Sequence, residues 1–348
     1  MPEVNAVQVA SNPHQTLLRL VFGSTGTQVV GAVVRLGLAD AIGEGQTAVD
    51  GIARHYDIPA ERMNRLLRAM VELDLATEPR PGVYSLTEAG HLLRVNHPGS
   101  LRHMARLVTD PVTQLPWSRL DSSVRTGRAA FEDVFGRPMF EHFAAHPDLS
   151  ALYNAAMGEI TRGLAVELAE CFDFSRFTRV TDVGGGDGTL LTTVLGRHPH
   201  LTGVVFDSPS GVAQTLGAVR AAGLDRRCTV TTGDFFEAVP TGSDLYLLKS
   251  IVHDWDDERA VTVLRRCGEA LGEGGRVLLV EQVLPERPES TEPRDPFLSD
   301  LTMLVLYGGR ERTRADLVEL CTRAGLKITS TATLPAQPGI SLMEATAT

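Results

Sequence analysis

The sequence predicts a two-domain α/β protein, with a helical domain over residues 1–163 and a domain built on a parallel β-sheet over residues 164–348. In the first part, apolar residues recur at spacings of three, four and seven, which is the period of amphipathic helices. In the second part, short apolar runs alternate with helical or loop sequence, which is typical of a parallel sheet with helices on both faces. A glycine-rich turn follows the first of these runs, where α/β folds often bind a ligand.

The composition is that of an ordinary globular protein, with 43% hydrophobic and 22% charged residues. Acidic residues exceed basic ones by 43 to 33, which gives a net charge of −10. A chain with this charge has no general electrostatic attraction to nucleic acids or anionic lipids. We therefore expect a small-molecule partner, with no nucleic acid and no membrane.

The four cysteines are widely spaced and form no C-x-x-C pair, which predicts buried free thiols in a reducing compartment. Residues 1–15 lack the basic start and the apolar core of a signal peptide. No run approaches the ~18 apolar residues of a membrane-spanning helix. These observations predict a cytoplasmic protein.

The helical part contains the pattern of a winged helix-turn-helix. Thr47 precedes a first short helix, Pro59 begins a second one, and a hairpin is expected over Leu75–Leu86. Such a module can bind DNA, and three arginines on the second helix could contact phosphate groups: Arg62, Arg65 and Arg68. Acidic neighbours dilute their charge: Glu61, Glu72 and Asp74. A long apolar helical pattern over Leu17–Leu38 is more than one small domain can bury, which predicts a dimer.

The sheet of the second part is predicted from its apolar runs. Five of them are expected as parallel strands: Val180–Val183, Gly203–Phe206, Thr229–Thr231, Leu245–Leu248 and Val277–Val280. Two later runs, Lys327–Leu334 and Ile340–Ala347, are expected as a closing hairpin. The stretch Pro285–Pro296 is rich in proline and glutamate, and we expect an exposed, mobile loop there.

The turn Asp182-Val-Gly-Gly-Gly-Asp-Gly188 lies between the first run and a helical segment, Thr189–Gly196. Glycines let the backbone approach a ligand closely, and N–H groups at a helix start point toward it. The pattern departs from the G-x-G-x-x-G fingerprint of dinucleotide sites and lacks the Lys-Ser/Thr of a phosphate-binding loop. A nucleoside without phosphates is therefore favoured, with Asp207 at the end of the next run as acceptor for the ribose hydroxyls. The alternative is a tight strand-to-helix turn without a ligand.

Three further segments follow in order along the chain: Gly233-Asp-Phe-Phe236, Leu248-Lys-Ser-Ile-Val-His-Asp-Trp255 and Gly308-Gly-Arg-Glu-Arg-Thr313. Together with the glycine turn they resemble the bacterial and plant small-molecule O-methyltransferases that convert S-adenosylmethionine (SAM) to S-adenosylhomocysteine, the family of caffeic acid O-methyltransferase. The resemblance covers nearly the whole chain. It implies a Rossmann-like SAM methyltransferase domain preceded by an all-helical winged-helix dimerisation domain, and hence a homodimer rather than a DNA-binding protein.

The resemblance also implies the residues that bind SAM, most of which directly follow an apolar run. Asp207 is expected at the ribose, Asp234 at the adenine amino group and Phe235 on the adenine plane. Lys249 is expected to pair with a carboxylate of the ligand, and Asp182 to hold the loop or the methionyl amine. The loop itself is formed by Gly184, Gly185 and Gly186. Each acid could instead cap a helix, and Phe235 could belong to the core.

Methyl transfer to a hydroxyl group needs a base, and the resemblance implies His253, flanked by Glu281 and Glu311. Carboxylates orient an imidazole and stabilise its cation. His253 could instead cap a helix, and Glu311 could pair with Arg310 or Arg312.

Three neighbouring residues have other interpretations. Asp254 is interpreted as a cap or loop tie, Trp255 as packing, and Asp300 as a support for the acceptor loop. No metal is expected, because the acids lack the clustered oxygen ligands of a magnesium site.

The acceptor wall implied by the resemblance combines a helix before the SAM domain with a segment around Tyr307; its residues are Tyr153, Asn154, Met157, Met303, Leu304 and Tyr307. Trp117 and Phe135 are candidates to close it, and each of these residues could instead be plain core. Ser250 stands where the plant enzymes carry tryptophan, which indicates a roomier pocket. We therefore expect O-methylation of a phenolic hydroxyl in an aromatic or polyketide natural product.

Two other functions stay open. Some members of the family bind SAM but hydroxylate, decarboxylate or rearrange their substrates, since a fixed sulfonium can stabilise an anion without reacting. The other function is that of a winged-helix regulator that binds a metabolite and a specific DNA duplex. The intact set of one histidine and two glutamates favours methyl transfer.

Overall fold

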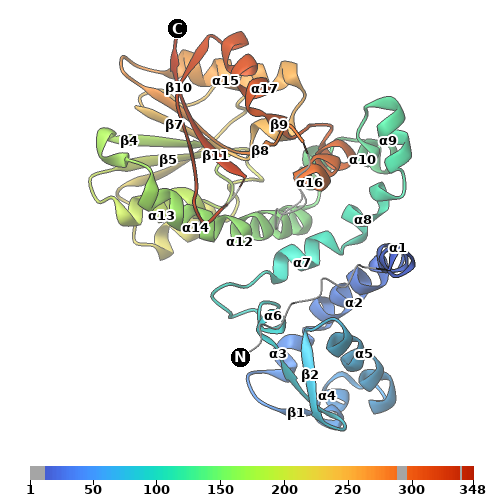
Figure 1. Cartoon of the computed structure of the whole chain (residues 1–348). Helices are drawn as coiled ribbons and strands as arrows, with labels where there is room; N and C mark the ends of the chain where they lie inside the picture. Colours follow the sequence, from blue (N-terminus) through green and yellow to red (C-terminus); the bar gives the residue numbers. More distant parts are fainter. Residues whose placement is uncertain (1–11, 288–295, 338) are drawn as a thin grey trace, which may run out of the picture. The chain divides into compact units, whose positions relative to one another are not determined.

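The computed structural model describes residues 12–287, 296–337 and 339–348. It divides into two compact units, Met1–Asp110 and Pro111–Thr348 (Figure 1). The division lies before the boundary expected after residue 163, because the helices that follow Asp110 contact other elements of the second unit. Most of the loop expected over Pro285–Pro296 lies outside the described residues.

The first unit contains two short helices and a hairpin in the expected order. The helices are α4 (Val49–Tyr56) and α5 (Ala60–Glu72), and the hairpin, called the wing below, consists of β2 (Ala76–Arg80) and β3 (Val83–Leu86). β1 (Thr47–Ala48) pairs with β3, so β1 and the hairpin form a three-stranded sheet in the order β1-β3-β2, and the unit is not all-helical. The other helices are α1 (Pro13–Val21), α2 (Gly23–Leu36), α3 (Leu38–Ile42), α6 (Glu88–His91) and α7 (Arg102–Val108).

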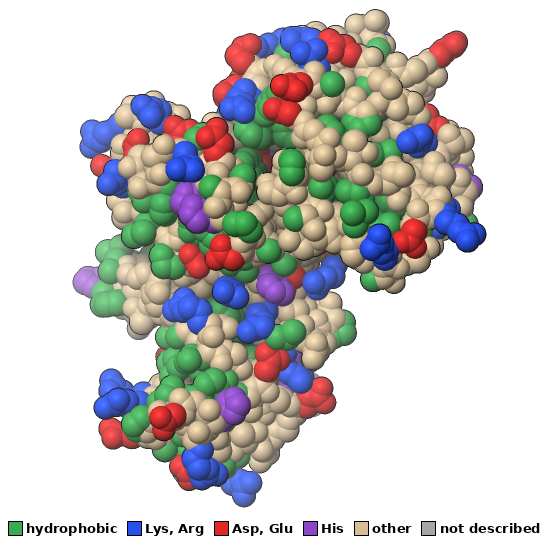
Figure 2. Space-filling model, turned by 180° about the vertical axis from the view of Figure 1, so that it is seen from behind, with side chains coloured by type: hydrophobic (Ala, Val, Ile, Leu, Met, Phe, Trp, Pro, Cys, Tyr) green, Lys and Arg blue, Asp and Glu red, His purple; other side chains and the backbone are tan. Residues whose placement is uncertain are grey.

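One face of α5 forms part of the core of this unit. Met63, Leu67 and Met70 recur at spacings of four and three and are buried. On the opposite side, the guanidinium of Arg68 donates to both carboxylate oxygens of Glu78 on the wing, at 3.1 and 3.2 Å. One of the three arginines considered for phosphate is therefore paired inside the unit. Acidic side chains also lie among the basic ones on the face shown in Figure 2.

α1 has an exposed apolar face. Its large apolar side chains are at least 51% exposed: Leu17, Leu18, Leu20, Val21 and the following Phe22. In the part of the chain that the structure describes, no single helix is long and apolar enough to cross a membrane. α1 and α2 pass that test only together, as a bent pair and by length and composition alone.

The second unit is built on an eight-stranded sheet with the order β10-β11-β8-β7-β4-β5-β6, and β9 beside β8. The five central pairings, from β6 across to β8 and on to β9, are parallel, whereas β11 runs antiparallel to β8 and β10. Each predicted run is a strand: β4 (Arg179–Val183), β5 (Thr202–Asp207), β6 (Cys228–Thr232), β7 (Leu245–Lys249), β8 (Arg276–Leu284), β10 (Leu326–Thr333) and β11 (Ile340–Ala347). The predicted α/β fold class is confirmed.

Helices cover both faces of this sheet (Figure 1). One core contains residues of α12 (Pro147–Cys171), α13 (Thr189–Arg197) and α14 (Thr215–Ala221). The other contains residues of α15 (Asp257–Ala270) and α17 (Arg314–Arg323). The strand order reverses at β4, with β5 on one side and β7 on the other, so a crevice for a ligand is expected at the carboxyl ends of these strands.

The remaining elements of this unit are short. They are α8 (Pro111–Trp117), α9 (Leu120–Thr126), α10 (Ala130–Phe135), α11 (Met139–Ala144), η1 (Phe174–Arg176), η2 (Val252–Asp254), α16 (Pro296–Thr302), η3 (Met303–Tyr307) and β9 (Arg312–Thr313). The π-helical turn η3 contacts α8, α9, α10 and η2, so the helices before α12 and the segment around Tyr307 form one region.

The cysteines differ in one respect from the prediction. Cys228, Cys267 and Cys321 are buried free thiols, as expected. Cys171 is also free but exposed, because it is the last residue of α12 and lies on the solvent side of that helix.

Candidate active site

The glycine turn allows three elements to meet at the carboxyl end of β4. Gly184 has a φ of 72°, and its N–H donates to the carbonyl of Phe206 at 2.8 Å. A side chain there would collide with Ile251, since a Cβ would lie 2.3 Å from its Cδ1. α12 approaches the same turn at Gly158, where a Cβ would lie 2.1 Å from Oδ2 of Asp187. The turn therefore presents backbone rather than side chains at Gly184.

Two carboxylates lie beside this turn. Asp207 accepts the N–H of Gly186 at 3.0 Å and that of Ser208 at 2.6 Å, which leaves part of its acceptor capacity unused. Asp182 is 2% exposed, and its Oδ2 has no hydrogen-bond partner among the described residues. Burial and the nearby Asp207 raise the pKa of Asp182 to about 7, although Lys249 opposes this shift. A buried carboxylate oxygen of this kind fits a ligand that brings N–H donors or positive charge.

The other residues expected to bind the cofactor lie at neighbouring strand ends. Lys249, at the end of β7, donates to the hydroxyl of Thr161 on α12 at 3.3 Å. Asp234 is exposed and accepts the N–H of Phe236 at 2.8 Å. The ring of Phe235 packs edge-on against Trp255, with centroids 5.9 Å apart. The structure thus gathers the predicted cofactor residues at one edge of the sheet.

The turn Ile251–Trp255, a candidate catalytic turn, follows β7 and includes η2. Its His253 is mostly buried, with 17% of the side chain exposed. Nδ1 of His253 lies 3.2 Å from both carboxylate oxygens of Glu311 and 3.8 Å from Oε2 of Glu281. Two glutamates that are far from His253 in the sequence therefore meet at its imidazole.

The two glutamates have different roles in this geometry. Oε1 of Glu281 accepts the backbone N–H groups of Ile251 and Val252 at 3.0 and 2.9 Å, and its Oε2 has no partner among the described residues. Glu311 contacts the imidazole directly. Glu281 therefore holds the backbone of this turn, whereas Glu311 orients the histidine ring.

Residues of α16 support Glu311. The hydroxyl of Ser299 donates to Oε1 of Glu311 at 2.8 Å, and Oδ1 of Asp300 accepts the backbone N–H of Glu311 at 2.9 Å. Asp300 thus supports the loop that carries a carboxylate partner of His253.

The electrostatics of this cluster favour a protonated histidine. Burial alone would lower the pKa of His253, but the carboxylates of Asp254, Glu311 and Glu281 outweigh burial and raise it to about 10. For Glu311, burial raises the pKa, but the hydrogen bond from His253 and its charge more than compensate and lower it overall. In the free protein at neutral pH, the imidazole is therefore held as a cation between carboxylates.

Asp254 differs from its interpretation as a cap or loop tie. Its Oδ1 lies 3.5 Å from Nε2 of His253, and the residue is 6% exposed. Burial raises its pKa to about 7, and the charge of His253 opposes this shift. The carboxylate therefore belongs to the histidine cluster, and the sequence signal for it was its position directly after His253.

An aromatic cluster lies in the region of the expected acceptor wall. The hydroxyl of Tyr307 donates to that of Tyr153 at 3.4 Å. The ring of Phe140, on α11, packs against both tyrosines and against Trp255, with centroids 5.6–5.9 Å apart. Trp255 thus packs as expected. Phe140 was not predicted, because the sequence does not reveal which face of this short helix meets α12 and η3.

The remaining acceptor candidates are distributed around this cluster. Met303 and Leu304 lie on η3 with Tyr307, and Met157 lies one helical turn after Tyr153 on α12. The amide of Asn154 instead donates to the carbonyls of Ser210 and Gly211, both at 3.0 Å, so it ties α12 to the segment after β5.

The other three candidates are Ser250, Trp117 and Phe135. Ser250 has a φ of 53°, a left-handed conformation that is uncommon outside glycine. Trp117 ends α8, and Phe135 packs against Phe131 and His142, with centroids 4.6 and 4.8 Å apart.

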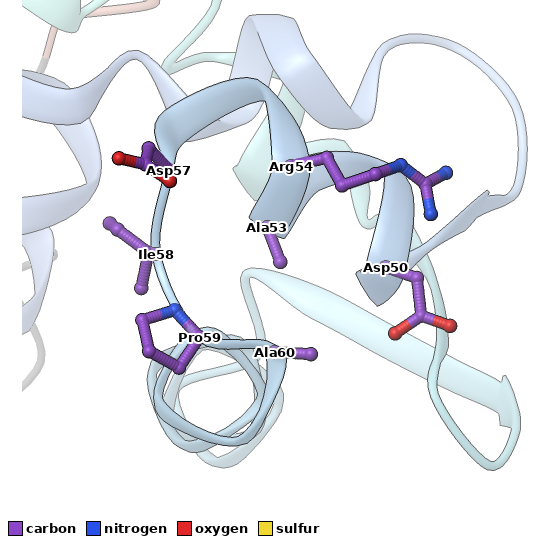
Figure 3. Close-up of a pocket in the computed structure, with 7 residues that line it drawn as sticks. All are labelled: Asp50, Ala53, Arg54, Asp57, Ile58, Pro59 and Ala60. Atoms are coloured by element: carbon purple, nitrogen blue, oxygen red, sulfur yellow. The ribbon is translucent and has the colours of Figure 1, made fainter.

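Two further features of the surface and the acidic side chains bear on other kinds of site. Within the described ranges, no group of three or more His, Cys, Asp or Glu side chains is arranged to hold a metal ion. A surface pocket of about 410 Å³ lies in the first unit (Figure 3). It is lined by Asp50, Ala53, Arg54, Asp57, Ile58, Pro59 and Ala60 around the turn between α4 and α5. It includes none of the predicted site residues.

The chain is similar to known proteins over most of its length. The chain matches the O-methyltransferase domain over residues 117–327 and the O-methyltransferase dimerisation domain over residues 18–96. It is 41% identical to O-demethylpuromycin-O-methyltransferase from Streptomyces alboniger, over 99% of this chain and 91% of that protein. It is also 34% identical to aclacinomycin 10-hydroxylase RdmB from Streptomyces purpurascens, over 85% of this chain and 79% of that protein.

Solved structures show the same fold. The crystal structure of LaPhzM is similar with a TM-score of 0.91 and 32% identity, over 97% of this chain and 100% of that one. NcsB1, an O-methyltransferase from neocarzinostatin biosynthesis, was crystallised with SAM and 2-hydroxy-5-methyl naphthoic acid; its TM-score is 0.76 at 33% identity, over 92% of this chain and 96% of that one. These matches span nearly the whole chain, and on this evidence it belongs to the O-methyltransferase family.

Proposed function

We propose that this protein uses SAM to methylate a phenolic hydroxyl group of an aromatic natural product, with His253 as the general base. The observation that carries the proposal is the buried imidazole bound to Glu311, beside Trp255 and its aromatic neighbours, at the sheet edge that holds the glycine turn. A relative named for methylating O-demethylpuromycin and a neighbour crystallised with SAM and a hydroxynaphthoic acid support this assignment.

The chain's own groups at this edge suit SAM, which supplies a methyl group on a positively charged sulfur. In the proposal, the backbone of Gly184, Gly185 and Gly186 lines the cofactor. Asp207 accepts the ribose hydroxyls, and the unpaired oxygen of Asp182 faces the methionyl ammonium. Lys249 pairs with the methionyl carboxylate, Asp234 accepts the adenine amino group, and Phe235 packs on the adenine plane.

The properties of His253 suit a phenolic acceptor. A phenol has a pKa near 10, and the carboxylates around His253 raise its pKa to about 10 as well, although burial alone would lower it. Proton transfer between groups of matched pKa is close to balanced, which favours general base catalysis. Because Nδ1 is bound to Glu311, Nε2 is the atom that takes the proton. Alignment of the acceptor with the methyl group contributes more than the base does, about 7–11 kcal/mol.

The acceptor lies, in this proposal, between α12 and η3. Tyr153 and Tyr307 offer hydroxyl groups to polar substituents, while Met157, Met303 and Leu304 offer apolar contacts. The small side chain of Ser250 leaves room for a larger ring system than a single phenol. Asn154 contributes by holding α12 in place.

The two units have different roles in this proposal. We infer that the first unit forms a homodimer through the exposed face of α1, in agreement with the matched dimerisation domain, and that the protein acts in the cytoplasm. The sequence predicts dimerisation by residues 1–163 and SAM binding by residues 164–348. With α12 in the second unit, the cofactor and acceptor sites both belong to residues 111–348.

The alternative within the family is chemistry without methyl transfer, since one relative is named a hydroxylase. Product analysis separates the two functions, because only methyl transfer adds a methyl group to the acceptor and forms S-adenosylhomocysteine. The pairing of Arg68 with Glu78 argues against a DNA-binding regulator, because Glu78 occupies a guanidinium that would otherwise contact phosphate.

We expect His253→Ala to lower the rate of methylation by roughly 10²–10⁴-fold while SAM affinity is retained, because the variant loses only the base. The measurement is the mass of the product and the amount of S-adenosylhomocysteine, with a panel of phenols and phenolic polyketides. His200→Ala is the matched control, since that histidine contacts the carbonyl of Phe174, away from the site. An altered substrate without methyl gain and with SAM intact would move the protein to the alternative function.

We expect the rate of the chemical step to rise with pH above neutrality, because a group with a pKa of about 10 is protonated at pH 7 and only neutral His253 accepts a proton. Glu311→Gln removes a carboxylate that raises this pKa, so the rising limb moves to lower pH, and the maximal rate falls because the ring is less well oriented. In Glu281→Gln the amide oxygen still accepts both backbone N–H groups, so the loss is smaller. Single-turnover rates against pH test this order; an unchanged limb in Glu311→Gln contradicts it.

We expect a dimer in sedimentation velocity at micromolar concentration, and its dissociation in Leu20→Glu, because that side chain is 70% exposed on the apolar face of α1. Leu216→Glu, at a 55% exposed leucine of α14, serves as the control and leaves the dimer intact. A monomeric parent protein excludes this interface.

A further inference from the structure

The catalytic turn is also bound on the side opposite Glu281, by Arg312 and its ion-pair partner Asp257. Arg312 follows Glu311, and its side chain is only 1% exposed. It is the largest of the fully buried side chains in the described residues, so its charge is enclosed by protein. Arginine is rarely buried to this extent unless its donors are satisfied. Its partners therefore show what the residue does.

The donors of Arg312 are directed at the catalytic turn. Nη1 donates to the carbonyl of Val252 at 2.7 Å, and Nη2 donates to the carbonyl of Trp255 at 2.8 Å. These carbonyls lie on either side of His253 and Asp254. Nε and Nη2 also bind Oδ1 of Asp257, at 3.2 and 2.8 Å, in the first turn of α15.

The backbone next to Arg312 adds a third contact. The N–H of Arg310 donates to the carbonyl of His253 at 2.9 Å. Gly309 packs so closely that a Cβ there would lie 2.1 Å from the same carbonyl oxygen. The segment 309–312 therefore covers the carbonyl side of the turn, while Glu281 binds its N–H side.

We propose that Arg312 is a positioning residue for methyl transfer: its guanidinium fixes the backbone on both sides of His253, so that the imidazole meets the acceptor oxygen in a reactive geometry. This inference rests on the proposed function, which it deepens. β9 begins at Arg312 and pairs with β8 at Val283, so Glu311, directly before β9, lies close to Glu281 on β8. One dipeptide, Glu311-Arg312, thus holds both the ring and the backbone of the base.

The geometry requires arginine in particular. A planar guanidinium donates in several fixed directions at once, whereas an ammonium is a single point of charge. Lysine at this position keeps the charge beside Asp257 but does not reach both carbonyls. A displacement of about 1 Å at a reacting group can cost on the order of 10² in rate, even when binding is unaffected.

The test compares Arg312→Lys with the parent protein. We expect kcat to fall roughly 10–10²-fold, with the KM for SAM and its calorimetric Kd unchanged, because only alignment is lost. In Arg312→Met, which also loses the charge, kcat falls further. Asp257→Asn, which frees the guanidinium from its carboxylate, shows the same split between kcat and KM to a smaller degree.

Arg227→Lys is the matched control. That arginine also donates to three backbone carbonyls, those of Leu195, His198 and Leu201, but it lies away from the catalytic turn. We expect the Arg227→Lys substitution to lower thermal stability and to leave kcat unchanged. If Arg312→Lys behaves in the same way, with a lower Tm and a normal kcat, the residue is merely structural and the proposal is wrong.

A second readout does not depend on methyl transfer. In protein labelled with ¹⁵N-histidine, the imidazole of His253, assigned with His253→Asn, reports its own pKa by NMR. We expect that pKa to fall toward its ordinary value in Arg312→Lys, because the turn moves His253 away from Glu311, and to stay unchanged in Arg227→Lys. An identical titration in Arg312→Lys overturns the proposal, whereas failure of the proposed reaction leaves this readout intact.

Discussion

The arrangement of this active site depends on how the short turn Ile251–Trp255 satisfies its backbone hydrogen bonds. The turn leaves β7 at a left-handed residue, Ser250, and is too short and irregular to bond only to itself. Glu281 binds two of its N–H groups, and Arg312 binds two of its carbonyls. Because unpaired polar groups are costly in a buried site, these charged partners confine the turn, and with it the direction of His253.

Electrostatics set the chemistry of the same region. Carboxylates surround His253, and more of them lie beside the glycine turn, where Asp182 has a pKa near 7 because it is buried close to Asp207. Such an excess of buried negative charge is unfavourable unless a cation balances it. Around His253 the balancing cation is the imidazolium, and at the glycine turn a positively charged ligand would do the same. One sheet edge is therefore suited to a cationic cofactor and to a strong base.

Much of the fold could be predicted from the sequence, because each strand of the second unit is a separate apolar run and the turn after β4 is rich in glycine. The family resemblance implied His253, Glu281 and Glu311 as a group, and the structure brings these three side chains together. The separate roles of the two glutamates, and the part of Asp254, depend on which oxygen faces which donor, which no spacing reveals. Phe140 and the division after Asp110 likewise depend on tertiary packing between short helices.

The most direct test of this account is a crystal structure of the protein with S-adenosylhomocysteine and a methylatable phenol. The account predicts the acceptor oxygen within hydrogen-bond reach of Nε2 of His253, about 2.6–3.2 Å, with Glu311 still on Nδ1 and the turn still bound by Glu281 and Arg312. An acceptor oxygen bound away from His253, or an imidazole turned away from Glu311, would contradict it.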